Sequence, residues 1–459
     1  MKTVLLSLVL SFPLFLNGDD LKIIDFGSLQ KRIIEKEEVY FSSDKNKPFT
    51  GKSVLNYPNG KECFMVFKNG KKDGKEEEYY PNKKKSWLGI YRDGKLITAK
   101  IWLPEGSVCN VTKVSNGNGS AQTYHPSGKV EWKGKYSNGL LDGVETCFFE
   151  NGKKEYESNY RNGKLEGSFS AFHENGEKQR EGNCKNGKKE GLWKYWYDSG
   201  KKKSEGNYKD GKDIGLWQYW YESGEKESEL KYLDGKQEGI STWFHKSGEK
   251  KSEENYKNGK AVGLCQYWYE NGQKEREGNC KDGKQVGLWQ YWDESGRKQS
   301  EQKYREGKRE GISTWFHKNG EKKSEGNYKN GKAVGLWQYW YESGEKKSEG
   351  YKDGKLEGLF IKWHESGQKE QEGNYKDGNA VGLWQYWYDS GKKKSEGNYK
   401  DGLRSGNWKF WYENGNKQQE ANYKEGKLDG VVIDYDKRGK ETLRKSYFQG
   451  ILKSEFKSR

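Results

Sequence analysis

Histidine side chains could bind a metal ion, and in this sequence they always occupy the same position of a repeated unit. Each of the five histidines follows an aromatic residue: His125, His173, His245, His317 and His364. A metal site needs several ligands close together, whereas successive histidines are two or three repeat units apart, roughly 19–29 Å along a sheet. Other units carry tyrosine at this place. We therefore interpret the histidines as structural aromatics and predict no metal site.

Cysteine is the second reactive residue type, and the chain has 6 of them. Cys184 and Cys280 occupy places where other units carry tyrosine, and Cys265 occupies a tryptophan place. Cys184 and Cys280 are four units apart, roughly 38 Å, which is beyond disulfide reach. Cys265 and Cys280 would be diagonal neighbours in one hairpin, about 7–8 Å apart, so a disulfide between these two is the one that remains possible. We expect buried free thiols.

Carboxylates are the third type, and they also recur: Glu205, Glu277 and Glu325 hold the same place in three units. A catalytic carboxylate pair belongs to one concave site, so a residue that is repeated along the chain indicates a structural element or a repeated binding element. The sequence has no nucleophile elbow, phosphate-binding loop or zinc motif. We predict no enzymatic activity, no catalytic residue and no cofactor.

A repeat of 24 residues positions all these side chains. A glycine before each aromatic run serves as the anchor, which we call position 0, and about seventeen such units follow one another, with Thr98 as the single non-glycine anchor. The most regular anchors are Gly191, Gly215, Gly239, Gly263, Gly287, Gly311, Gly335, Gly358, Gly382 and Gly406. Repetition at this period is the signature of an array in which each unit packs on its neighbours.

Each unit carries two turn signals, such as Ser199-Gly200 and Asp210-Gly211. Pairs of this kind between alternating segments indicate two-residue type I′ turns, which need positive φ at both central residues. Every unit is therefore predicted to be a β-hairpin. The predicted fold is all-β: an elongated array of about seventeen 24-residue hairpins that form one twisted antiparallel meander sheet of about 34 strands.

The turns also predict which residues share a face. With a two-residue turn at positions 8 and 9, Trp193 at position 2 lies opposite Gly206, which leaves room for the indole, and shares a face with Tyr195 and Tyr208. Leu192 and Trp196 lie on the other face. The aromatics expected to hold the array together are Trp193, Trp196, Trp217, Trp220, Trp289, Trp292, Trp337, Trp340, Trp384, Trp387, Trp408 and Trp411.

Both ends of the chain depart from the repeat. Residues 1–18 have a basic Lys2 followed by an apolar run, which predicts a secretory signal peptide; a buried N-terminal strand is the alternative. Residues 19–46 are predicted to cap the first edge strand. The array spans 47–430, and 431–459 form a degenerate last repeat with a basic tail. We expect an exported chain located in the periplasm, at the cell surface or in the medium.

Composition agrees with an array rather than a globule. Charged residues make up 34% of the chain and hydrophobic residues 31%, which is too little aliphatic material for one core, while 15% aromatic residues argue against disorder. The net charge of +16 comes with interleaved Lys and Glu, which is typical of a solvated surface. We expect no nucleic-acid partner and at most a weak contact with an anionic membrane or cell-wall surface.

The repeat Gly-x-Trp-x-Tyr-Trp-Tyr-x-(Ser/Asn)-Gly, followed by Glu-Gly-Asn-Tyr-Lys-Asp-Gly-Lys, resembles the bacterial MORN repeat variant over roughly residues 47–450. The lead-in Lys47–Gly51 is similar to the opening of YwqK-type antitoxin-like proteins. The resemblance implies an elongated sheet that contacts proteins or membranes. Ordinary MORN repeats begin Gly-x-Gly, whereas Trp193 and Trp217 stand at the second glycine here, so phosphoinositide binding is not expected.

Two functions remain open from the sequence. The first is a non-enzymatic exported scaffold that binds an unidentified protein or envelope polymer through repeated weak contacts. The second is a carbohydrate or cell-wall binding module, because ladders of Trp and Tyr resemble the aromatic platforms that stack on sugars.

Overall fold

The computed structural model describes residues 23–25, 29–34, 37–42 and 47–457. The predicted signal peptide lies outside the described residues. The chain divides into two compact units, residues 1–215 with 222–224, and residues 216–221 with 225–459. All regular elements of the described residues are strands, and none of these residues forms a helix long and apolar enough to cross a membrane.

The strands of the first unit are β1 (Ile23–Asp25), β2 (Leu29–Ile34), β3 (Glu37–Ser42), β4 (Gly51–Asn56), β5 (Glu62–Lys68), β6 (Lys71–Tyr79), β7 (Lys85–Arg92), β8 (Lys95–Ile101), β9 (Lys113–Ser115), β10 (Asn118–Tyr124), β11 (Val130–Ser137), β12 (Leu140–Leu141), β13 (Gly143–Phe148), β14 (Lys154–Arg161), β15 (Lys164–Phe172), β16 (Lys178–Lys185), β17 (Lys188–Trp196) and β18 (Lys202–Lys209). The division between the units falls within β19 (Lys212–Trp220).

The strands that follow are β20 (Lys226–Leu233), β21 (Lys236–Gln237), β22 (Gly239–Phe244), β23 (Lys250–Lys257), β24 (Lys260–Trp268), β25 (Lys274–Lys281), β26 (Lys284–Trp292), β27 (Lys298–Arg305), β28 (Lys308–Phe316), β29 (Lys322–Lys329), β30 (Lys332–Trp340), β31 (Lys346–Asp353), β32 (Leu356–Trp363), β33 (Lys369–Lys376), β34 (Asn379–Trp387), β35 (Lys393–Lys400), β36 (Leu403–Trp411), β37 (Lys417–Lys424), β38 (Lys427–Tyr435), β39 (Glu441–Phe448) and β40 (Ile451–Lys457).

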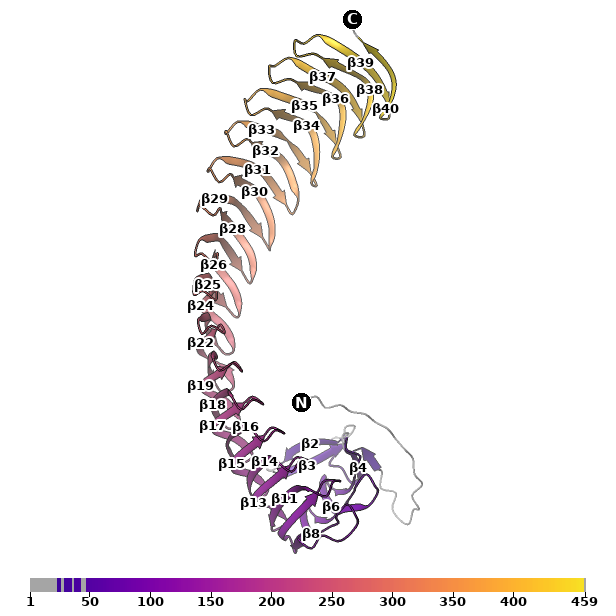
Figure 1. The fold of residues 1–459 in the computed structure, drawn as a ribbon, viewed down its shortest axis with the longest axis vertical. Helices are drawn as coiled ribbons and strands as arrows, with labels where there is room; N and C mark the ends of the chain where they lie inside the picture. Colours follow the sequence, from indigo (N-terminus) through magenta and orange to yellow (C-terminus); the bar gives the residue numbers. More distant parts are fainter. Residues whose placement is uncertain (1–22, 26–28, 35–36, 43–46, 458–459) are drawn as a thin grey trace. The chain divides into compact units, whose positions relative to one another are not determined.

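The predicted antiparallel meander is confirmed (Figure 1). From β4 to β40 the chain runs back and forth through one open sheet, which has 38 strands when β1 is included. Strand β1 pairs in parallel with β4, on the side of β4 that does not pair with β5, and β2 and β3 form a separate hairpin. The sheet has more strands than predicted partly because β12 and β21 are short pieces cut off by bulges.

The turn at Asp210-Gly211 is the type I′ turn that the sequence predicts. Asp210 has φ 52° and Gly211 φ 82°, so both central residues adopt the left-handed conformation. Other hairpins repeat this pair, for example at Asp282 and Asn330. Each such turn is also tied to the preceding one, because the Gly211 N–H donates to the Lys189 carbonyl at 2.9 Å.

The turn at Ser199-Gly200 is different, and the prediction of a two-residue turn was wrong there. Gly200 has φ 79° and its N–H donates to Tyr197 O, while Tyr197 N–H donates to Lys201 O. This is a three-residue loop in which a type I turn ends in a glycine bulge. A second bulge between Tyr195 and Trp196 shifts the register by one residue. The two irregularities compensate, so the predicted pairing of Trp193 with Gly206 is confirmed.

The anchor glycines lie in bulges. Between β25 and β26 the pairing passes from Asn279↔Val286 to Gly278↔Trp289. Gly287 and Leu288 therefore have no partner on β25, although both pair with β27. Gly287 has φ 69°, a conformation that side chains other than glycine rarely adopt. The regular anchors share this property: Gly191, Gly215, Gly239, Gly263, Gly287, Gly311, Gly335, Gly358, Gly382 and Gly406 all have φ between 66° and 93°.

The N-terminal region, which we define as residues 47–142, packs differently from the rest. The divergent stretch 98–118 contributes Ile101, Cys109 and Val114 to a buried cluster with Trp87 and Leu96. The sheet curls enough for the Lys61 Nζ, between β4 and β5, to reach the Tyr124 carbonyl on β10 at 3.2 Å. The sequence marks 98–118 as a divergent unit that lacks the glycine anchor, but the buried core of this region was not predicted.

A one-residue deletion in the unit after Gly335 illustrates how the register controls the faces. This unit has 23 residues and lacks the asparagine that precedes tyrosine in its neighbours. Gly350 still pairs with Trp337, but Tyr351 now pairs with Leu336. Because neighbouring residues point to opposite faces, Tyr351 moves to the face of Leu336 and is 49% exposed.

Candidate functional site

The repeated hairpins present two faces, and we call the first the Trp face: positions 2, 4 and 17, as in Trp193, Tyr195 and Tyr208. These three rings contact one another, with centroids 6.3 Å apart for Trp193–Tyr195 and 6.1 Å for Trp193–Tyr208. The tryptophans that the sequence assigns to position 2 are all nearly completely buried: Trp193, Trp217, Trp289, Trp337, Trp384 and Trp408. The Trp face is therefore a packed aromatic layer.

Five of these indoles, those of Trp193, Trp289, Trp337, Trp384 and Trp408, each cover a glycine of the preceding hairpin. At Gly397 the nearest atoms to an added Cβ would be those of Trp408, 2.2 Å away, although Trp384 is the residue directly opposite Gly397 in the hairpin. The same holds for Trp193 over Gly182 and for other units. The prediction that Gly206 makes room for the Trp193 ring was therefore wrong, because this ring leans across to Gly182 of the neighbouring hairpin.

The chain compensates at three places where this pairing changes. Position 2 there carries Ser or Cys instead of tryptophan, and position 15 of the preceding unit carries a larger side chain than glycine. Where phenylalanine replaces tryptophan, at Phe360, the glycine is kept as Gly350. The pairs that face each other are Leu230 with Ser241, Glu254 with Cys265, and Gln302 with Ser313. A fixed offset of 11 residues links the two positions, so the correlation is readable in the sequence, where it was missed. It identifies the hairpin-to-hairpin interface as a large residue packed on a small one.

The indole N–H adds a polar contact to this interface. Trp289 Nε1 donates to the Asn279 carbonyl of the preceding hairpin at 3.1 Å, and Trp408 donates to Asn398 at the same distance. A buried donor without a partner would cost about 1–3 kcal/mol. Tryptophan therefore fills the space above the glycine and satisfies its own N–H.

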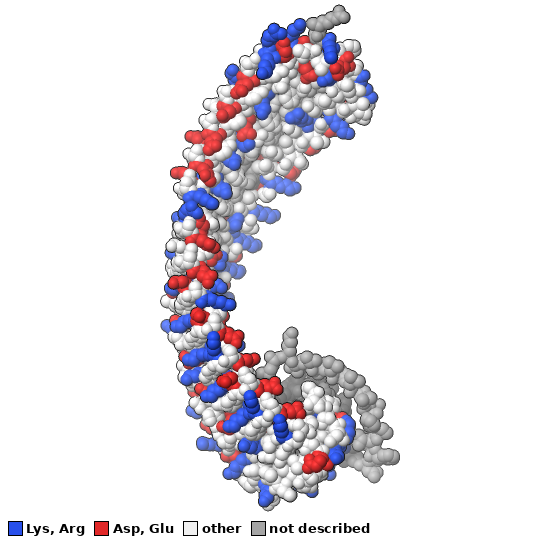
Figure 2. All heavy atoms as spheres, viewed as in Figure 1, with Lys and Arg blue, Asp and Glu red and all other residues white. Residues whose placement is uncertain are grey.

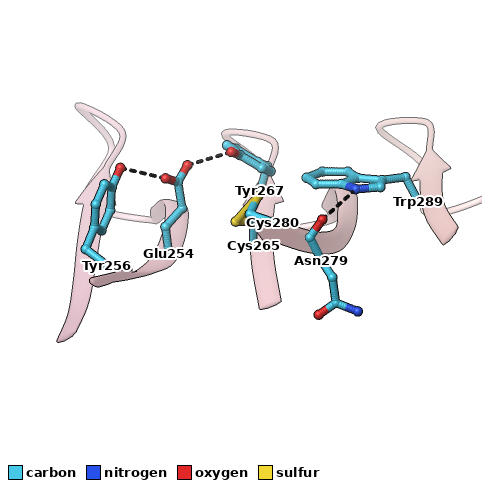
Figure 3. Close-up of a disulfide and its surroundings, with 7 residues drawn as sticks. All are labelled: Glu254, Tyr256, Cys265, Tyr267, Asn279, Cys280 and Trp289. Carbon is cyan, nitrogen blue, oxygen red and sulfur yellow. Dashed lines mark hydrogen bonds between the residues drawn. A yellow bond between two sulfur atoms is a disulfide. The ribbon is translucent and has the colours of Figure 1, made fainter. Parts of the chain in front are cut away.

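A disulfide joins Cys265 and Cys280, whose Cα atoms are 6.2 Å apart. The expectation of free thiols was therefore wrong for this pair, whereas Cys184 is free and buried, as predicted. The bridge stands where other units place Trp at position 2 and Tyr at position 17, so it replaces an aromatic contact by a covalent one. Figure 3 shows it between Tyr267 and Trp289.

The space next to the disulfide is filled by a carboxylate. Glu254 stands where other units have glycine, and it accepts hydrogen bonds from Tyr256 at 2.6 Å and Tyr267 at 2.5 Å (Figure 3). Burial raises the pKa of Tyr267 and keeps its hydroxyl protonated as a donor. The group is a closed polar network inside the Trp face.

The second face, which we call the Leu face, carries positions 1, 3, 5 and 14. The tryptophans predicted at position 5 are half-buried here: Trp196, Trp220, Trp292, Trp340, Trp387 and Trp411. Lysines of the preceding hairpin lie over them, as Lys274 does over Trp292, 5.5 Å from the ring centre. The same Lys274 pairs with Glu277 at 2.7 Å, and Gln266 donates to Glu277 at 2.9 Å.

Beside this charged network runs a row of exposed aliphatic residues at position 1. Leu264 is 51% exposed and Ile312 is 55% exposed, and the directly opposite residue is an exposed asparagine, such as Asn279 opposite Leu264. The row consists of Leu192, Leu216, Ile240, Leu264, Leu288, Ile312, Leu336, Leu359, Leu383 and Val431. From Leu192 to Leu383 its members recur every second strand, roughly 9.6 Å apart, and Asn407 interrupts the row before Val431.

The histidines lie at position 6 of their hairpins and contact the next hairpin. The Nε2 atom of His245 is 2.8 Å from the Trp268 carbonyl, and tyrosines at this position do the same, as the Tyr269 hydroxyl does to the Trp292 carbonyl at 2.8 Å. The other four histidines, His125, His173, His317 and His364, make the equivalent contact. Histidine and tyrosine are thus interchangeable links between hairpins.

A hollow of about 410 Å³ opens on the second unit. Trp315, Tyr328 and Trp337 supply aromatic walls, while Asp293 and Arg297 are among its polar lining residues. An aromatic wall with a few polar groups is a common arrangement in small-molecule sites.

A buried polar cluster lies in the N-terminal region. The ligating atoms of Cys63, Glu76 and Glu78 lie within 4.8 Å of one another. Burial, with a further contribution from Glu76, raises the pKa of Glu78 to about 7. Lys72 forms an ion pair with Glu76, and the charge of Lys61 lowers the pKa of Glu78. The two ammonium groups thus offset part of the negative charge of the cluster.

Comparison with protein families identifies the repeat. Eight of the hairpins match the MORN repeat variant. The matched segments are 141–162, 189–210, 237–258, 261–282, 309–330, 356–377, 380–401 and 404–425. Each begins two residues before an anchor glycine or before its equivalent, so the family unit and the structural hairpin coincide.

Two solved structures are similar over most of this chain. They are described as the crystal structure of TcdB2-TccC3-Cdc42 and the crystal structure of TcdB2-TccC3 without its hypervariable C-terminal region. Both are 10% identical with a TM-score of 0.14; this chain is covered to 88% and 90%, and it spans 26% and 24% of those chains. A TM-score this low supports no argument about fold or function. No curated protein matches the chain.

Proposed function

We propose that this MORN-variant array is a non-enzymatic scaffold that binds a protein partner along its Leu face. The observation that carries the proposal is the row of exposed aliphatic residues at position 1. Exposed aliphatic side chains repeated at a regular spacing along one face offer a series of apolar contacts to a partner. Each contact is small, and an elongated partner with apolar side chains would gain affinity from occupying several of them at once.

A pull-down from envelope extract tests this. The probe is the full chain with L264S, L288S, I312S and L336S, compared with a control carrying N255S, N279S, N327S and N374S on the same face. Support requires one identified protein that the wild type and the asparagine variant retain and the leucine variant loses. No retained protein, or a protein that both variants retain equally, contradicts the proposal.

A second candidate function is binding of a cell-wall carbohydrate, and the hollow beside Trp315 favours it. Aromatic rings with adjacent polar groups suit a sugar, whose faces are apolar and whose edges carry hydroxyls. Titration with purified cell-wall glycan should change the tryptophan fluorescence of the wild type and leave that of Trp315→Phe unchanged. An unchanged wild-type signal at millimolar glycan discards this candidate.

The cellular context remains a proposal as well. We propose export from the apolar segment at residues 1–18, and a disulfide at Cys265 is what an oxidising compartment allows. Kinship with YwqK-type antitoxin-like proteins rests on Lys47–Gly51 and implies no chemistry. Expression of the full chain in its native host, followed by N-terminal sequencing of the secreted or envelope fraction, tests both the export and the cleavage near Gly18.

A further inference from the structure

The ends of the hairpins that carry type I′ turns bear pairs of cations. In four consecutive hairpins the two residues that flank the turn pair directly across the strands. These pairs, which we call the Lys edge, are Lys257 with Lys260, Lys281 with Lys284, Arg305 with Lys308, and Lys329 with Lys332. All eight residues are exposed.

Like charges in directly opposite positions destabilise a strand pair, because their Cβ atoms lie only about 4.5–5.5 Å apart. None of the eight side chains forms a hydrogen bond or an ion pair with another described residue. The repeat therefore places, four times in succession, a charge arrangement that opposes folding and that no internal contact offsets.

The opposite ends of the same hairpins do not share this charge. The four-residue turn segments of the Lys edge contain eight cations and two acidic residues, Asp282 and Glu306. The four turn segments at the other end, 246–249, 270–273, 294–297 and 318–321, contain three cations and four acidic residues. Figure 2 shows cationic side chains spaced along one border of the hairpins and mixed charges along the other. A surface that served solubility alone would not need this asymmetry.

The distance between successive cation pairs indicates how long a ligand must be to contact all of them. Successive pairs are two strands apart, roughly 9.6 Å, so the four pairs form a line of roughly 29 Å. A single small anion would occupy one pair, whereas a chain of negative charges would contact all four and release counterions at each. We propose that the Lys edge binds a linear polyanion, a polymer that carries phosphate groups along its length. This site is separate from the Leu face and does not depend on the protein partner proposed above.

Substitutions can remove one cation from each pair. K260Q, K284Q, K308Q and K332Q are combined in one full-length variant. A matched control carries K246Q, K251Q and K318Q, exposed lysines on or beside the opposite turns, and K392Q, an exposed lysine on the equivalent turn of a later hairpin. Both variants have the same net charge. The probes are long-chain inorganic polyphosphate, orthophosphate, and phosphatidylcholine vesicles that contain phosphatidylglycerol.

The wild type and the control should bind polyphosphate with affinities within about twofold of each other. The Lys-edge variant should bind at least about tenfold more weakly, with a shallower dependence on salt. Its thermal unfolding temperature should be unchanged or higher, because the like-charge pairs are gone, and this measurement excludes misfolding as the cause. Equal losses in both variants, equal affinity for orthophosphate per phosphate, or binding to vesicles alone would overturn the proposal.

Discussion

The N-terminal region and the hairpins from Gly239 to Gly430 are built from the same repeat, yet they are stabilised differently. In the N-terminal region Leu96 and Ile101 are completely buried in one cluster to which five consecutive strands, β7 to β11, contribute. In the later hairpins the largest buried side chains are tryptophans, and each packs on a glycine of the hairpin before it. The comparison teaches that a sheet can dispense with an aliphatic core when most units bury one large ring against a neighbour and the others bury a large residue against a small one.

Removal of one such ring should have the largest effect. Trp408→Ala deletes a side chain that is 0% exposed and its hydrogen bond to Asn398, and we expect a loss of about 3–5 kcal/mol in local stability. Hydrogen exchange followed by mass spectrometry should show faster exchange in β35–β37 and little change in the N-terminal region. Trp411→Ala, which removes a half-exposed ring, is the control. Equal loss of protection along the whole chain would mean that the array is not stabilised hairpin by hairpin.

The corresponding change in the N-terminal region should act over a wider range. Leu96→Ala leaves a cavity in the cluster of Trp87 and Val114, at a cost of about 2–5 kcal/mol. Because strands from β7 to β11 contribute to this cluster, peptides from all of them should exchange faster together. Leu403→Ala, at a site that is 48% exposed, should change stability by no more than about 0.5 kcal/mol. Faster exchange confined to β8 would contradict a shared core.

Reduction of the disulfide tests what a covalent link adds to an aromatic interface. The bridge closes a loop of 15 residues, for which the chain-entropy model gives about 3 kcal/mol. Reductant should accelerate exchange in β24 and β25 of the wild type and of Cys184→Ala. The double variant Cys265→Ser and Cys280→Ser should not respond to reductant; a response there would assign the effect to another thiol.

The two regions should also respond to pH in opposite directions. The pKa of Glu78 is raised from 4.5 to about 7, so the folded N-terminal region holds this proton more tightly than the unfolded chain. The protonated Glu78 contributes fully to the stability of the folded region below pH 4.5. This contribution is lost as the pH rises through 7, and the loss in the free energy of unfolding is at most about 3 kcal/mol. Glu78→Gln should abolish this loss.

In the later hairpins the sign is reversed. Lys298 lowers the pKa of Glu301, and Lys393 lowers that of Glu396. These Lys–Glu pairs stabilise the folded hairpins at pH values above the ordinary pKa of glutamate. This stabilisation is lost as the pH falls through the lowered pKa of the paired glutamate. Hydrogen exchange of each region at several pH values checks both signs. If both regions lost stability on the same change of pH, the proposed difference between them would be refuted.

The repeat period allowed most of the fold to be predicted. The positive φ needed at Asp210-Gly211 identifies a type I′ turn, and the two turns of each unit predict the order of the strands. The turn predicted at Ser199-Gly200 assigns Trp193 and Leu192 to opposite faces. The loop that ends at Gly200 was misjudged, because a type I turn with a glycine bulge and a two-residue turn both use a Ser-Gly pair. The compensating bulge at Trp196 hides the error in the final register.

The contacts between hairpins were harder to predict. Turn geometry reports which residues are opposite within a hairpin, but the direction in which the Trp408 ring leans depends on the neighbouring hairpin. The Cys265–Cys280 bridge was misjudged for a similar reason, because the diagonal distance from ideal strands exceeded the 6.2 Å found between the Cα atoms. The core of the N-terminal region depends on how far the sheet curls, which no local pattern reports.

The packing of each tryptophan on the preceding glycine has a consequence at the end of the chain. The interface runs head to tail, and a head-to-tail contact has no intrinsic endpoint: one chain could continue into the next and build a fibre. The last units remove both halves of the contact. Val432 replaces the tryptophan over Ala421, and Lys445 stands where a following ring would need glycine. A further copy of the tryptophan–glycine contact would therefore find neither its tryptophan nor its glycine in these last units.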